Sequence, residues 1–107
     1  MSSDVLMQLA ATIRARRESA AGSSYTRQLL DAGPAKCAKK LGEEAIEAVI
    51  AGTSESDEAL KAEAADLIYH LLVLLESRGV AFDDVLAVLE SRTGQSGLEE
   101  KASRGKS

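Results

Sequence analysis

The segment from Leu67 to Leu75 constrains the fold most, because it is apolar around most of a helix. A helix that is apolar on all sides must be buried on all sides. β-Branched residues are sparse and no alternating apolar runs occur, so strands are not expected. We therefore predict an all-α bundle of about four to five helices. A single chain of 107 residues can hardly enclose such a helix, so we expect a homodimer that completes the bundle.

Capping residues, glycines and one proline divide the chain into the expected helices. The first begins after Ser2 or Ser3. Pro34 suits the first turn of the third helix, and Gly52 is a candidate for its C-cap. We expect one domain, residues 1–107, with a helical core at about 3–92 and a tail at 93–107. A short second helix, capped by Ser23 or Ser24, is expected to end before Gly33. The third is expected at about 34–51, the fourth from the polar loop at 53–56 to about residue 78, and the fifth at about 82–92.

Two acidic clusters stand at helical spacing in the third and fourth expected helices. Glu43, Glu44 and Glu47 share one face of the third helix. Glu63 and Asp66 share one face of the fourth. Like charges at this spacing repel, and a hard divalent cation with oxygen ligands, Mg²⁺ above all, would compensate. The alternative is that both faces are solvated, as acidic runs on helices usually are.

The neighbours of these clusters favour a buried site over a solvated face. The acidic stripe of the fourth helix continues into Leu67 and further apolar positions, and buried carboxylates need partners. His70 lies on the same stripe, where a structural histidine is favoured over a catalytic one. Lys40 shares the face of the first cluster. It either forms an ion pair with Glu43 or Glu44, or contacts a phosphate group.

Composition limits the possible partners and the cellular location. A net charge of −4 and a pI near 5.0 argue against a general binder of nucleic acid or of anionic membranes. The lone Cys37 and the single histidine exclude an intrachain disulfide and a Cys/His metal site. No signal-peptide pattern is visible, and the longest apolar stretch is too short to span a bilayer. We expect a cytoplasmic protein without membrane or nucleic-acid partners.

The segments around the acidic clusters resemble the phosphoribosyl-ATP pyrophosphohydrolase family, within the MazG-like all-α superfamily. The pattern E-E-x-x-E followed by E-x-x-D is typical of the superfamily. More specific segments extend the resemblance over nearly the whole chain: S-Y-T at 24–26, K-K-L-G-E-E at 39–44, A-D-L-I-Y-H-L-L at 65–72 and S-G-L-E-E-K-A-S-R at 96–104. The resemblance implies Mg²⁺-dependent hydrolysis of phosphoribosyl-ATP to phosphoribosyl-AMP and pyrophosphate, the second step of histidine biosynthesis.

The resemblance also implies roles for individual residues. Glu43 is implied as a further metal ligand or as the base that orients the attacking water, with Glu44 and Lys40 beside it in the catalytic group. The implied metal ligands are Glu44, Glu47, Glu63 and Asp66. The candidate contacts for substrate are Lys36, Lys40, His70, Lys101 and Arg104. Two alternatives remain: a house-cleaning pyrophosphohydrolase of free nucleoside triphosphates, and a non-enzymatic helical dimerisation module.

Overall fold

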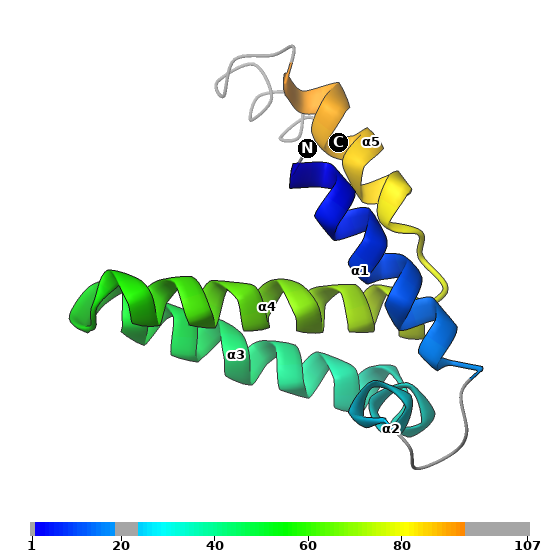
Figure 1. The fold of residues 1–107 in the computed structure, drawn as a ribbon, viewed down its shortest axis with the longest axis horizontal. Helices are drawn as coiled ribbons and strands as arrows, with labels where there is room; N and C mark the ends of the chain where they lie inside the picture. The colour runs from blue at the N-terminus through cyan, green and yellow to red at the C-terminus, as the bar shows by residue number, and fades with distance from the viewer. Residues whose placement is uncertain (1, 19–23, 94–107) are drawn as a thin grey trace, which may run out of the picture.

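A computed structural model describes residues 2–18 and 24–93 of the chain (Figure 1). This described part consists of helices and connecting turns and contains no strand. This confirms the predicted all-α fold. The elements in chain order are α1 (Ser2–Arg16), α2 (Tyr25–Ala32), α3 (Pro34–Ser54), α4 (Asp57–Ser77) and α5 (Phe82–Thr93).

The antiparallel pair of α3 and α4 forms the long arm of the molecule, and the other helices gather at one end of it (Figure 1). Side-chain caps start two of these helices: the Ser24 hydroxyl accepts from the Arg27 N–H at 2.9 Å, and Ser56 accepts from the Ala59 N–H at 3.1 Å. Residues from α1, α2, α3 and the second half of α4 form the buried core: Ile13, Leu29, Cys37, Leu72 and Val73.

The end of α3 differs from the prediction. The helix runs through Gly52 to Ser54, so the prediction that it ends near residue 51 with Gly52 as the C-cap is wrong. The C-cap is Glu55, which has extended backbone geometry and donates its N–H to the Ala51 carbonyl at 3.1 Å. The hydroxyls of Thr53 and Ser54 also bond back to the helix, to the carbonyls of Val49 and Ile50, each at 2.9 Å.

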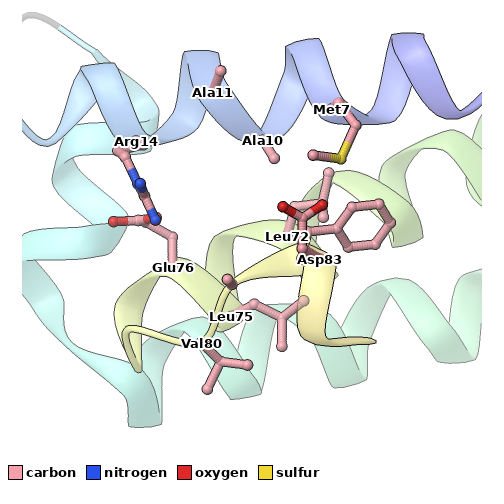
Figure 2. A pocket seen from close by; sticks show the side chains of 11 residues that line it. Met7, Ala10, Ala11, Arg14, Leu72, Leu75, Glu76, Val80 and Asp83 are labelled. Atoms are coloured by element: carbon pink, nitrogen blue, oxygen red, sulfur yellow. The ribbon is translucent and has the colours of Figure 1, made fainter. Parts of the chain in front are cut away.

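A carboxylate near the end of α4 ties that helix to α1. The Glu76 side chain, 15% exposed, lies 3.5 Å from the Arg14 Nε and 3.0 Å from the Arg17 Nε. Arg17 also donates to the Glu76 carbonyl. Figure 2 shows Arg14 reaching Glu76 at one edge of a partly apolar hollow between α1, α4 and the start of α5, which Met7 and Leu72 help to line.

One chain leaves much of its apolar surface uncovered. No residue of α5 is buried, and Leu89 on that helix is 53% exposed. On α4, Ile68 within the strongly apolar segment is 40% exposed. The radius of gyration is 16.0 Å, above the ~13 Å expected for a compact chain of about 100 residues. None of the described helices is both long enough and apolar enough to cross a membrane.

Candidate metal centre

The pairing of α3 with α4 brings three carboxylates together. Glu44 on α3 and Glu63 and Asp66 on α4 each offer one oxygen, and these oxygens all lie within 4.8 Å of one another. Glu44 and Glu63 are partly buried and Asp66 is exposed, so the group is open to solvent on the Asp66 side. A cluster with only carboxylate oxygens fits a hard divalent cation such as Mg²⁺ better than Zn²⁺ or copper.

Glu63 is the member of this carboxylate cluster that most needs a partner. Its Oε1 atom is buried and has no hydrogen-bond donor among the described residues. Loss of solvent raises the pKa of Glu63, and the negative charges of Glu47, Glu44 and Asp66 raise it further. Buried polar atoms in proteins normally have a partner. A bound cation would supply one and would also neutralise the repulsion, so the residues fit the metal that the sequence implied.

Lys40 and Glu43 form an ion pair beside the carboxylate cluster. The Lys40 Nζ lies 3.2 Å from the Glu43 Oε1, three residues further along α3. The hydrogen bond to Glu43 raises the pKa of Lys40, with a smaller contribution from Tyr25. Of the partners considered for Lys40, Glu43 is the one that the structure shows. A phosphate contact for Lys40 and a metal or water contact for Glu43 stay predictions.

Glu47 lies one turn beyond Glu43 on α3 and is exposed. Among the described residues, the three-carboxylate group includes neither Glu47 nor Glu43. Helical spacing places Glu47 one turn from Glu44 on the same face of α3, and its charge contributes to the raised pKa of Glu63. Its predicted role as a metal ligand is therefore compatible with its position but is not tested.

His70 lies behind the cluster and is only 6% exposed. Its Nε2 atom is 4.0 Å from the Glu44 Oε1. Burial lowers the pKa of His70, and the positive charge of Lys40 acts in the same direction, against the nearby carboxylates. The imidazole is therefore expected to be neutral at pH 7. Its predicted contact with substrate stays untested.

Tyr25, which sequence reasoning did not include in the site, packs against the His70 ring, with the ring centroids 6.1 Å apart. Its neighbour Thr26 forms a hydrogen bond with the Tyr69 hydroxyl, which anchors the start of α2 to α4. The only signal for this region was the S-Y-T segment of the family resemblance, which carried no role.

The remaining candidate substrate contacts fall in two places. Lys36 is exposed in the first turn of α3, on the same helix as Glu44. Lys101 and Arg104 lie outside the described residues. All three contacts stay predictions.

The antiparallel pair of α3 and α4 brings three carboxylates together, so the structure defines an all-α protein with a candidate metal centre between these two helices. Residues 6–93 match the family model described as phosphoribosyl-ATP pyrophosphohydrolase. The chain belongs to this family, as the sequence segments predicted.

Proteins named phosphoribosyl-ATP pyrophosphatase are similar in sequence to this chain over nearly its whole length. Phosphoribosyl-ATP pyrophosphatase 1 of Rhodopseudomonas palustris is 55% identical over 104 residues, which covers 97% of each chain. The phosphoribosyl-ATP pyrophosphatase of Nitrobacter winogradskyi is 57% identical over 92% of this chain and 84% of its own. That of Jannaschia sp. is 54% identical over 92% of this chain and 97% of its own.

Proposed function

We propose that the chain hydrolyses phosphoribosyl-ATP to phosphoribosyl-AMP and pyrophosphate with Mg²⁺, the second step of L-histidine biosynthesis. The observation that carries the proposal is the cluster of Glu44, Glu63 and Asp66, in which a buried Glu63 oxygen has no partner among the described residues. The names of relatives that are more than half identical support the choice of substrate. A biosynthetic step of this kind fits a cytoplasmic location.

Each carboxylate has a distinct task in this proposal. Glu44, Glu63 and Asp66 would hold the cation, with Glu47 as a further ligand from the exposed side. Bound Mg²⁺ supplies charge for the phosphate oxygens and a more acidic bound water. The partial burial of Glu44 and Glu63 lowers the local dielectric and strengthens their electrostatic interaction with a cation.

The Lys40–Glu43 pair would handle charge and protons at the edge of the site. Lys40 stays protonated, since its pKa is raised, and its ammonium group can exchange Glu43 for a phosphate oxygen. Glu43 released from this pair can accept a hydrogen bond from the attacking water and orient it. The surface position of Lys36 on the same helix makes it a second candidate for phosphate contact.

A homodimer is the second part of the proposal. An apolar stripe on α3, formed by Ile46, Val49 and Ile50, is 46–64% exposed in one chain, and α5 is similarly uncovered. A partner chain would bury these surfaces. Val49→Glu changes a side chain that is 64% exposed, so the single chain should still fold while the dimer weakens. Sedimentation at micromolar concentration tests this, with Ala35→Glu on the same helix as control. A stable wild-type monomer would contradict the proposal.

The rival function is hydrolysis of free nucleoside triphosphates, which would use the same carboxylates. Phosphoribosyl-ATP carries a second phosphorylated ribose, and an enzyme built for it uses binding energy from that remote part in the transition state. Removal of that part should lower turnover as well as affinity. Membership of a hydrolase family argues against the non-enzymatic dimerisation module.

Product analysis with the purified full chain separates these functions. The chain is given phosphoribosyl-ATP or a panel of free triphosphates, with Mg²⁺ and with EDTA. We expect pyrophosphate release that needs Mg²⁺ and a kcat/KM highest for phosphoribosyl-ATP. Preference for a free triphosphate would be compatible with the metal site but would reject phosphoribosyl-ATP as the substrate. Equal rates with EDTA would reject the metal-dependent function.

A further inference from the structure

The His70 imidazole is buried at a point where it can act on a metal-binding carboxylate but is poorly placed to meet substrate. It is only 6% exposed, and its Nε2 atom lies 4.0 Å from the Glu44 Oε1 across the α3–α4 interface. A side chain so covered offers little surface to a ligand in solution. Any effect of His70 on the metal site would therefore be transmitted by Glu44.

Two aromatic rings hold the imidazole in one orientation. The Tyr69 ring, next to it on α4, is 4.9 Å away between centroids, with an interplanar angle of 78°. The Tyr25 ring from α2 is 6.1 Å away at 87°. Both are edge-to-face contacts, the favourable arrangement for ring pairs. Tyr69 is itself hydrogen-bonded to Thr26, so the support of the ring extends to α2.

The surroundings of the two ring nitrogens select one tautomer. The Nδ1 atom is buried and has no hydrogen-bond partner among the described residues. It is therefore unsatisfied in either tautomer, and the surroundings of Nε2 decide. A proton on Nδ1 would leave the bare Nε2 lone pair facing the Glu44 carboxylate, which repels it. A proton on Nε2 instead faces the Glu44 carboxylate. The neutral imidazole therefore carries its hydrogen toward Glu44.

We propose that His70 is a positioning residue whose Nε2–H orients the Glu44 carboxylate toward Glu63 and Asp66. The inference rests on the proposed metal site. At 4.0 Å the His70 Nε2 and the Glu44 Oε1 are too far apart for a direct hydrogen bond, so the proposed contact would run through one bridging water. Carboxylates that bind metals are themselves commonly hydrogen-bonded, and loss of such a partner typically costs about 10–100-fold in metal affinity.

The test measures Mn²⁺ affinity of the full chain without substrate, by calorimetry or electron paramagnetic resonance, because Mn²⁺ suits the same oxygen ligands as Mg²⁺. His70→Phe keeps a planar ring and removes the donor. His70→Gln places an amide N–H near the former Nε2 position, and His70→Asn places it near the former Nδ1 position. Melting temperature and helical content are recorded for each variant.

We expect H70F and H70N to bind Mn²⁺ about 10–100-fold more weakly than wild type and H70Q to stay within a few-fold of it. The inference is overturned if folded H70F binds Mn²⁺ as wild type does, or if H70Q is as weak as H70N. If H70F does not fold, the Gln and Asn pair decides. Absence of Mn²⁺ binding by wild type would reject the proposed metal site itself, which is a different result from equal binding by all four proteins.

Discussion

The two halves of α4 each carry a partly buried glutamate, and the two glutamates differ in what surrounds them. Glu76, in the second half, is paired with Arg14 of α1 and with Arg17, which directly follows α1. Glu63, in the first half, is surrounded by other carboxylates and has a buried oxygen without a donor among the described residues. The same helix thus contains one glutamate paired with arginines, Glu76, and one without a cationic partner among the described residues, Glu63.

In the proposed function, this difference separates a carboxylate that supports the fold from one that binds the metal ion. Glu76 lies next to the apolar core that includes Leu72 and Val73, and its arginines attach α1 to α4. Glu63 lies beyond that core, where α3 contributes Glu44 instead of a basic residue. An acidic group without a compensating partner lowers the stability of the ligand-free protein, which makes Glu63 a candidate for ligand binding. The predictions below test this contrast, from the largest expected effect to the smallest.

Loss of one charge in the carboxylate cluster should have the largest effect. Glu44→Gln and Asp66→Asn keep side-chain shape and remove a ligand charge. We expect kcat/KM for phosphoribosyl-ATP to fall by about 1,000-fold or more, since a metal ion contributes several kcal/mol and each 1.4 kcal/mol is tenfold. Circular dichroism should show unchanged helical content. Near-wild-type turnover in both variants would show that the cluster is not the site.

Truncation in the core half of α4 should act on stability instead. Leu72 is 3% exposed, so Leu72→Ala should lower the free energy of unfolding by about 2–5 kcal/mol. Lys61→Ala on α4, where the side chain is 73% exposed, is the control and should change it by less than about 0.5 kcal/mol. Urea denaturation measures both. An equal effect of the two would contradict the placement of Leu72 in the core.

Mg²⁺ should stabilise wild type but not a variant without Glu63. At 100 times its dissociation constant a ligand adds about 2.7 kcal/mol to stability, which a thermal melt detects. Glu63→Gln should melt at a higher temperature than wild type in EDTA, because it removes a repelled and desolvated charge. It should then gain little from Mg²⁺. A lower melting temperature of the variant in EDTA would contradict the account of Glu63.

The raised pKa of Glu63 also predicts a pH dependence for the metal-free protein. The folded state holds the proton to higher pH than the unfolded state does. The stability from this group is therefore present below about pH 4 and is lost as the pH rises through the folded-state pKa. In EDTA, the difference in melting temperature between Glu63→Gln and wild type should grow with pH over this window. A constant difference would mean that the pKa is not raised.

The smallest effect on stability is expected at Glu76, the glutamate that is paired with arginines. Glu76→Gln removes the charge that faces Arg14 and Arg17, both of which are well exposed. We expect a loss of about 1 kcal/mol or less, and a smaller loss at high salt because solvent ions screen the pair. Hydrogen exchange at α1 should rise slightly while phosphoribosyl-ATP hydrolysis stays normal. A large loss of activity would show that α1 also positions the metal site.

Local patterns in the sequence predicted most of the helices. Pro34 marks the start of α3 as expected, and Gly79, with a positive φ of 70°, follows the end of α4. The error at Gly52 arose because a glycine near a helix end resembles a cap. In the structure the helix continues through Gly52 to Ser54, and Glu55 is the C-cap. Which residue near a helix end leaves the helical conformation is difficult to judge from the sequence.

The sequence alone determined that Glu63 and Asp66 share a face and that Glu43, Glu44 and Glu47 share another, because helical spacing dictates it. Only the tertiary structure decided which of these acids meet. The register of α3 against α4 placed Glu44 with the α4 pair and left Glu43 with Lys40. Register depends on packing between segments distant in the chain, which side-chain periodicity within one helix does not specify.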